Sequence, residues 1–354
     1  MVHKASYPAR QGTIGWTCPS NIALIKYWGK KPGQLPRNPS LSMTLKEAHT
    51  ITKLNYSYEA GQKKKRPVFR FEGKKAPAFE DRIVSYLKEL ESHIPLLSHT
   101  HLEIDSKNSF PHSSGIASSA SAMGALALCL IQLEEEVTGL MDGEKFWQKA
   151  SQIARLGSGS ASRSIYPRFA LWGQHSLWKE SSDEYAIPLL GIHESFFKIR
   201  DSILIVESGP KKISSSAGHG FMETHPYANI RFRQARENLG QLYEAMKEGD
   251  WEVFITLMEE EALSLHALMM TGKPGYILMQ PGTLSILQLI REYRKDTGKR
   301  LGFTLDAGAN VHLLFAEEDA PQVESFINSE LAAYCEKGWI IRDKMGDGPE
   351  KSAP

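Results

Sequence analysis

The sequence predicts an α/β fold of the α+β type, with strands and helices mixed in two successive halves. Alternating or β-branched runs come early, as in GTIGWTC and TITKLNYSYEA. Helical spacing begins at FEDRIVSYLKELESHI and returns over residues 225–248, 250–270 and 281–296. The length of 354 residues suits two domains of ordinary size. We expect these domains at residues 1–195 and 196–354.

The remaining segments complete this pattern in chain order. VFRFEG and HLEID predict strands, EKFWQKASQIARLG predicts a helix ending at a glycine, and DSILIVESGP predicts a buried strand. GFTLDAGANVHLLFAE predicts two strands around a tight turn. A helix over QVESFINSELAAYCEKG and a short strand at WIIRDK follow. The tail GDGPEKSAP is expected to be frayed.

Composition and charge are those of a folded soluble protein. Hydrophobic residues make up 41% and charged residues 23%, and the net charge of +1 provides no long-range field for nucleic acid or an anionic membrane. The N-terminus lacks the apolar core of a signal peptide, and no run is long enough to span a membrane. The three cysteines show no zinc or redox spacing, and Cys129 is expected in the core. We therefore expect a cytoplasmic protein.

A glycine- and serine-rich loop leads without a break into an apolar run at SGIASSASAMGALALCL, residues 114–130. Small residues and serines before a helix allow several backbone N–H groups to face an anion closely. The same pattern also suits a capped helix start that packs tightly. Neither GxxxxGK[ST] nor GxGxxG is present, so a phosphate loop here would be of another kind.

The densest early basic cluster follows the first strand and comprises Lys26, Lys30, Lys31 and Arg37. Charge count alone favours a solvated loop. Tyr27 and Trp28 interrupt the cluster, however, and their rings are costly to expose, which indicates a walled pocket.

Two further segments carry candidate site residues. GSGSASRS, residues 157–164, has the composition of a flexible linker, but the planar fork of Arg163 is suited to a carboxylate and the neighbouring serines to phosphate oxygens. Asp306 stands at the end of an apolar strand, a position where aspartate often only caps a turn.

Taken together, these motifs resemble the diphosphomevalonate decarboxylase family of the GHMP kinase superfamily. PHSSGIASSA is similar to the superfamily's central motif, while SNIALIKYWGK with LPRNPSLSMTL, GSGSASRS and FTLDAGANVHLLF are similar to motifs of the decarboxylases. The resemblance implies GHMP kinase-like two-layer sandwich domains with a cleft between the N- and C-terminal halves. The first half would be a ribosomal S5 domain 2-like ATP-binding domain. IYPRFALW departs from the family pattern at Pro167 and Arg168.

The resemblance also implies residue roles. Catalytic roles fall to Asp306, Lys26 and Arg163. Substrate contacts fall to Asn21, Tyr27, Lys30, Ser158 and Ser160, and a weaker match in GPKKISSSAGHGF adds Ser214. The ATP phosphates would lie against Ser114, Gly115, Ala117, Ser118 and Ser119. No metal site formed by the protein alone is expected; Mg²⁺ would come with the ATP phosphates, next to Ser118 or Ser119.

The implied activity is ATP-dependent decarboxylation of (R)-5-diphosphomevalonate to isopentenyl diphosphate, ADP, phosphate and carbon dioxide. ATP and Mg²⁺ would be required, and the protein would be a homodimer. Two alternatives remain: a related small-molecule kinase that phosphorylates mevalonate or phosphomevalonate and stops there, and a non-catalytic binding protein, which should have lost a reactive residue. The sequence leaves open whether the substrate carries one or two phosphates at C5.

Overall fold

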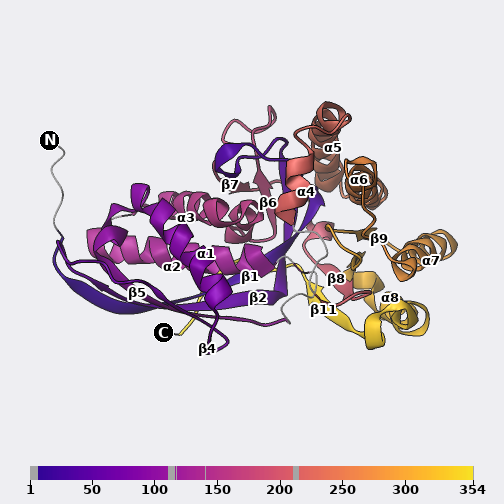
Figure 1. Cartoon of the computed structure of the whole chain (residues 1–354). Coiled ribbons are helices and arrows are strands. Elements are labelled where there is room, and N and C mark those ends of the chain that lie inside the picture. Colours follow the sequence, from indigo (N-terminus) through magenta and orange to yellow (C-terminus); the bar gives the residue numbers. More distant parts are fainter. Residues whose placement is uncertain (1–6, 111–115, 117, 140, 210–214, 354) are drawn as a thin grey trace.

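A computed structural model of the protein describes residues 7–110, 116, 118–139, 141–209 and 215–353. Two β-sheets run through the described part of the chain, and helices pack on both (Figure 1). The mixed α/β class predicted from the sequence is therefore confirmed.

The larger sheet has eight strands in the order β12-β1-β2-β5-β3-β4, with β6 pairing β2 and β7 pairing β6. Its strands are β1 (Arg10–Ile25), β2 (Ser40–Tyr58), β3 (Val68–Phe71), β4 (Lys74–Lys75), β5 (Thr100–Asn108), β6 (Phe169–Trp172), β7 (Ala186–Pro188) and β12 (Glu350–Lys351). Only the pairing of β3 with β5 is parallel among those described. Burial alternates along the second half of β2, as expected for a strand with one face on the core.

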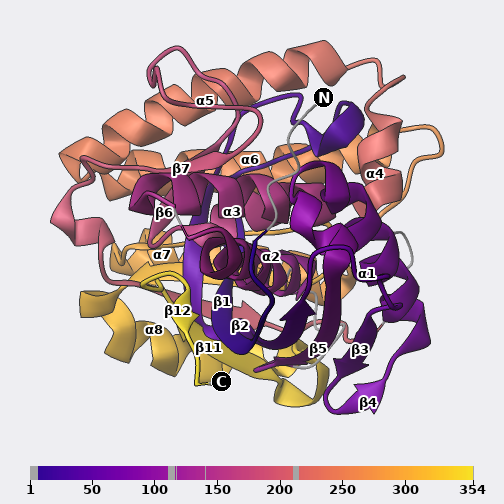
Figure 2. The ribbon, with the colours of Figure 1, turned by 90° about the vertical axis from the view of Figure 1, so that its left-hand side faces the viewer.

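Three helices cover one face of this sheet: α1 (Pro77–Glu89), α2 (Ser118–Thr138) and α3 (Gly143–Gly157) (Figure 2). α2 is the apolar run that follows the serine-rich loop, and it is buried along most of its length because it lies between the sheet and the other helices. α3 begins where the Asp142 side chain accepts a hydrogen bond from the Glu144 amide. The helix that follows the serine-rich segment is thus anchored in the core.

The smaller sheet has the order β11-β8-β10-β9 and is antiparallel throughout. Its strands are β8 (Ile199–Leu204), β9 (Leu301–Thr304), β10 (Val311–Ala316) and β11 (Ile340–Lys344). The helices of this half are α4 (Ser215–Phe221), α5 (Ala228–Glu248), α6 (Trp251–Thr271), α7 (Pro281–Thr297) and α8 (Ala320–Phe326). The helix predicted over QVESFINSELAAYCEKG is α-helical only in α8, which ends at Phe326. A π turn and short 3₁₀ turns follow as far as Gly338.

The two sheets are joined where β1 and β2 lose their regular register. The pairing shifts between Pro19 and Asn21, so β2 bulges between Thr44 and His49. The Asp343 carboxylate of β11 accepts hydrogen bonds of 2.8–2.9 Å from the amides of residues 46–48 in this bulge. Burial raises the pKa of Asp343. The bulge therefore both docks the smaller sheet and turns the end of β1 toward the second half.

The prediction of a frayed tail is wrong. β12 pairs with β1, with Lys351 opposite Trp16, and the Ser352 amide donates to the Gly15 carbonyl at 3.0 Å. The Lys351 ammonium lies 5.9 Å from the centre of the Trp16 ring. Backbone pairing and this cation–π contact hold a segment that composition alone suggested would be loose.

Other expectations were met or remain open. Cys18, Cys129 and Cys335 are all buried, which confirms Cys129 as a core residue. No helix in the described ranges is long and apolar enough to cross a membrane. The division into residues 1–195 and 196–354 stays a prediction, and β12 shows that the second part also adds a strand to the first part's sheet.

Candidate active site

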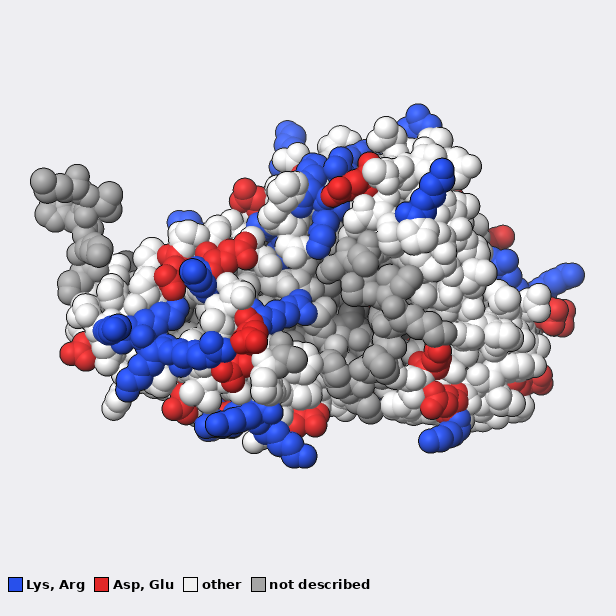
Figure 3. Space-filling view, in the orientation of Figure 1, with Lys and Arg blue, Asp and Glu red and all other residues white. Residues whose placement is uncertain are grey.

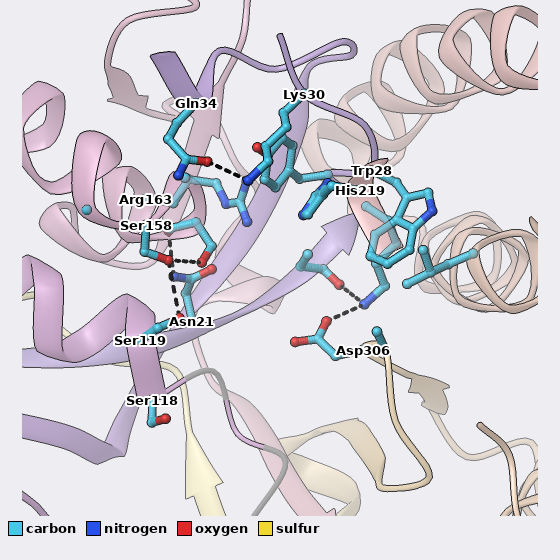
Figure 4. Close-up of a pocket in the computed structure, with 18 of the residues that line it drawn as sticks. Asn21, Trp28, Lys30, Gln34, Ser118, Ser119, Ser158, Arg163, His219 and Asp306 are labelled. Atoms are coloured by element: carbon cyan, nitrogen blue, oxygen red, sulfur yellow. Dashed lines mark hydrogen bonds and ion pairs between the residues drawn. The ribbon is translucent and has the colours of Figure 1, made fainter. Parts of the chain in front are cut away.

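A cavity of about 350 Å³ lies between the two halves of the chain (Figure 4). The first half contributes the end of β1 with its following loop, the start of α2, and the turn after α3. The second half contributes α4, α6 and the turn between β9 and β10. Of the residues predicted for the site, those lining it are Asn21, Lys26, Tyr27, Lys30, Ser118, Ser119, Ser158, Ser160, Arg163 and Asp306.

Lys26 and Asp306 meet inside this cavity from opposite halves. The Lys26 Nζ atom lies 3.3 Å from Asp306 Oδ1 and donates to the Ala23 carbonyl at 2.6 Å. The Lys26 side chain is 2% exposed, whereas that of Asp306 is 29% exposed and so accessible from the cavity. Burial lowers the pKa of Lys26, and the charge of Asp306 opposes that effect. A cation and an accessible carboxylate therefore stand side by side.

The backbone of Lys26 is held by a buried ion pair that sequence analysis did not find. Its amide donates to Glu261 Oε2 at 2.9 Å, and Glu261 of α6 is bound through both carboxylate oxygens by the Arg231 guanidinium of α5. The Asn38 side-chain amide donates to the Lys26 carbonyl at 3.0 Å. No motif marks Glu261, which is one of three consecutive glutamates in a helix.

Arg163 is one of the largest fully buried side chains. Its Nε and one terminal nitrogen donate to the hydroxyls of Ser42 and Ser40 on β2. The guanidinium also lies 5.7 Å from the Trp172 ring centre. Burial lowers the pKa of Arg163 to about 10, so the group stays charged at neutral pH. The two serines and the ring fix the orientation of a cation that faces the cavity.

The serines of two separate motifs face one another. Ser119 Oγ, at the start of α2, lies 3.2 Å from Ser158 Oγ, and Ser158 Oγ lies 3.5 Å from Ser160 Oγ. The Asn21 amide nitrogen donates to the Ser164 hydroxyl at 2.8 Å and to the Ser160 carbonyl at 3.1 Å. This arrangement places hydroxyl groups from residues 118–119 and 158–160 along one wall. Among the predicted residues, Ser114, Gly115, Ala117 and Ser214 lie outside the described residues.

A neighbouring wall is aromatic and basic, and the Tyr27 ring lies against Gly159, beside Ser158 and Ser160. The buried Tyr27 hydroxyl has no hydrogen-bond partner in the described part of the chain, and Lys30 Nζ donates to Gln34 Oε1 at 3.1 Å. Burial lowers the pKa of Lys30. His219 completes this wall and was not predicted, since nothing in GPKKISSSAGHGF singles it out. Arg168, the departure from the family pattern, stacks on Phe197 and does not line the cavity.

Basic side chains are concentrated on one part of the surface near the cavity. On the face shown in Figure 3, Lys and Arg side chains gather over the first half and are interleaved with acidic ones, while the adjoining surface of the second half carries few charges. In the described ranges, no group of three or more His, Cys, Asp or Glu side chains is arranged to hold a metal ion.

A second, smaller cavity of about 120 Å³ adjoins the first at Ser118 and Ser119 and is lined mainly by apolar side chains, including Phe69 and Met123.

Comparison with known proteins identifies the family of this chain. Residues 18–184 match the model of the diphosphomevalonate decarboxylase-like N-terminal domain, and residues 202–350 match that of the mevalonate 5-diphosphate decarboxylase C-terminal domain. The diphosphomevalonate decarboxylase of Debaryomyces hansenii is 30% identical over 329 residues, which cover 88% of this chain and 81% of that protein. The chain belongs to the diphosphomevalonate decarboxylase family.

Solved structures of diphosphomevalonate decarboxylases share the fold. The crystal structure of mevalonate diphosphate decarboxylase from Staphylococcus aureus has a TM-score of 0.83 and 28% identity, covering 97% of this chain and 99% of that one. A structure of the Enterococcus faecalis decarboxylase has a TM-score of 0.81 and 26% identity, covering 98% and 100%. A complex of MDDEF with MVAPP, AMPPCP and magnesium has a TM-score of 0.82 and 26% identity over the same shares. The GHMP kinase-like architecture expected from the sequence is thereby confirmed.

Proposed function

We propose that the protein catalyses the ATP-dependent decarboxylation of (R)-5-diphosphomevalonate to isopentenyl diphosphate, ADP, phosphate and carbon dioxide. The observation that carries this proposal is the Lys26–Asp306 pair in a cavity that Arg163 also lines. Family membership supports the same reaction, since the relatives are decarboxylases of this substrate.

The chemistry explains why a carboxylate and an ammonium group are needed together. Hydroxide is a poor leaving group, so the tertiary C3 hydroxyl must first be phosphorylated. Asp306 orients this hydroxyl and accepts its proton as the oxygen attacks the γ-phosphate. Lys26 keeps Asp306 ionised and offsets the negative charge of the transferring phosphoryl group, a role suited to its position 3.3 Å away.

Arg163 and the serines are proposed to hold the two ends of the substrate. The Arg163 guanidinium binds the C1 carboxylate, from which carbon dioxide leaves once phosphate departs and positive charge builds at C3. Ser158 and Ser160, with Asn21, Tyr27 and Lys30 nearby, bind the 5-diphosphate. The buried Tyr27 hydroxyl supports this assignment, because it has no hydrogen-bond partner among the described residues and a bound diphosphate would supply one. Ser214 is proposed for the same wall.

ATP is proposed to lie with its phosphates against Ser114, Gly115, Ala117, Ser118 and Ser119, and with its adenine in the adjoining apolar cavity beside Phe69 and Met123. The start of α2 and its serines suit an anion. Mg²⁺ would be held by the ATP phosphates with the hydroxyl of Ser118 or Ser119, because the described residues offer no acidic cluster. When bound, the ion neutralises phosphate charge.

One assay separates the decarboxylase from the kinase alternative. ADP, phosphate and carbon dioxide are measured with mevalonate, its 5-phosphate and its 5-diphosphate as substrates. We expect equal release of all three products with the 5-diphosphate. ADP release without carbon dioxide would instead establish a kinase. Release of all three products only with the 5-phosphate would show that the substrate carries one phosphate at C5.

The proposal also covers the domain boundaries, the oligomeric state and the cellular location of the protein. The division into residues 1–195 and 196–354 is supported by the two family models, which end and begin at residues 184 and 202. The homodimer and the cytoplasmic location rest on the sequence resemblance and composition. Light scattering of the purified protein and fractionation of cells test these two features.

A further inference from the structure

His219 has no part in the chemistry proposed above, yet it lines the same cavity. It belongs to α4 and is 8% exposed. Its ring centre lies 4.3 Å from that of Tyr27 and 4.8 Å from that of Trp28. In Figure 4 the imidazole is seen between Lys30 and Asp306. The two aromatic contacts hold the ring in a defined orientation.

The tautomer of this histidine is fixed by its neighbour. The Gly29 backbone amide donates to His219 Nδ1 at 3.0 Å. Because a backbone N–H only donates, Nδ1 must carry a lone pair, and in the neutral ring the proton is therefore on Nε2. No described residue is hydrogen-bonded to Nε2, so this N–H is available to a ligand in the cavity.

The ring is also neutral at working pH. Burial lowers the pKa of His219 to about 3, and the charges of Lys30 and Arg163 act in the same direction. An additional cation would be repelled by these two groups. A neutral N–H donor adds a hydrogen bond to an anion without that repulsion.

We propose that His219 is a substrate-binding residue whose Nε2–H donates to a phosphate oxygen of the 5-diphosphate. This inference rests on the proposed function for the identity of the substrate. Lys30, whose charge lowers the pKa of His219, lines the same cavity and is the cation proposed above for the diphosphate, whereas Arg163 is proposed for the carboxylate. Hydrogen bonds to charged groups are the strong ones, so loss of this bond corresponds to about a tenfold to hundredfold weaker affinity.

A matched pair of substitutions distinguishes substrate binding from a purely structural role. In His219→Asn the side-chain oxygen takes the place of Nδ1 and accepts from Gly29, but nothing reaches the position of Nε2. In His219→Gln the side-chain amide nitrogen reaches that position, but the Gly29 amide loses its acceptor. We expect KM for diphosphomevalonate to rise about tenfold to hundredfold in His219→Asn with kcat little changed, and to stay within about threefold of wild type in His219→Gln. A residue that only capped Gly29 would give the reverse order, which would overturn the proposal.

Direct binding keeps this test separate from the test of the reaction. Calorimetry with inorganic pyrophosphate should show the same order of affinities, wild type close to His219→Gln and both tighter than His219→Asn. If the wild-type protein bound pyrophosphate but released no carbon dioxide, the proposed function would be contradicted. The binding affinities would still show whether His219 contacts the diphosphate. Equal affinities of all three proteins would contradict the role of His219.

A measurement on the unaltered protein covers the case in which a variant does not fold. Long-range ¹H–¹⁵N NMR of the histidine rings reports which nitrogen carries the proton. We expect a neutral ring protonated at Nε2, whose resonances move when pyrophosphate is added. A ring protonated at Nδ1, or one unaffected by saturating pyrophosphate, would exclude the proposed hydrogen bond.

Discussion

Glu261 accepts a hydrogen bond from the backbone amide of Lys26 at 2.9 Å, although the two residues are far apart in the chain. Glu261 is 0% exposed and its partner Arg231 is 2% exposed. The pair thus ties α5 and α6 to the end of β1, where the Lys26 side chain turns toward Asp306. Positioning of the reactive lysine depends on a charge pair that contacts no predicted substrate atom.

Replacing Glu261 by glutamine should destabilise the protein strongly. Glutamine still accepts from the Lys26 amide but leaves the Arg231 charge buried and uncompensated, which costs about 3–5 kcal/mol of unfolding free energy. Urea denaturation measures this loss. The matched control is Glu260→Gln, at an exposed neighbouring position, with an expected change within about 0.5 kcal/mol. Equal effects of the two substitutions would show that the buried pair is not important for stability.

Asp306→Asn should reduce turnover by at least about a hundredfold without loss of the fold, because the amide neither accepts the C3 hydroxyl proton nor pairs with Lys26. A preorganised electrostatic group of this kind contributes about 2.7–4 kcal/mol to the transition state. Coupled assays of ADP and carbon dioxide give the rate, and circular dichroism checks the fold. Asp347→Asn, at a side chain that is 82% exposed, should keep wild-type activity. Near-normal turnover of Asp306→Asn would refute its catalytic role.

The rate should depend on the protonation of Lys26. Burial lowers the pKa of this group, so its charge is present below the lowered pKa and is lost as pH rises through it. The alkaline limb of kcat/KM should therefore fall at a pH below the ordinary value for lysine of about 10.4. Lys26→Arg should abolish this limb, because guanidinium keeps its charge, while Lys31→Arg, in the loop outside the cavity, should not move it. An unchanged limb in Lys26→Arg would assign it to another group.

Arg163→Ala should lower turnover by at least about a hundredfold through loss of the carboxylate contact. The substitution also removes the guanidinium that donates hydrogen bonds to the buried Ser40 and Ser42 hydroxyls, which is a structural cost. Ser42→Ala removes one of these hydrogen bonds but keeps the guanidinium, so we expect a loss of less than about tenfold. Steady-state kinetics and thermal denaturation of both variants separate the two effects. A larger loss in Ser42→Ala than in Arg163→Ala would contradict carboxylate binding by Arg163.

Periodicity and motifs predicted most of the fold and several of the charged residues that line the cavity. The helices α5, α6 and α7 follow from apolar spacing sustained over many residues, and Lys26, Arg163 and Asp306 stand in distinctive strings. Glu261 and Arg231 were missed because their importance arises only from a tertiary contact. β12 was missed because a two-residue strand has no period and is stabilised by its partner β1. His219 was missed because its tautomer and orientation are set by Gly29, Tyr27 and Trp28, which no spacing rule connects to it.

The burial of the cysteines has a practical consequence for labelling. Reagents such as maleimides attack the thiolate, and burial raises the pKa of the Cys18 and Cys129 thiols and that of Cys335 to about 11. The native protein should therefore be inert to them without any cysteine being removed. A single cysteine introduced at the exposed rim residue Arg82 would accept one fluorophore, whose emission could follow occupancy of the cavity in real time.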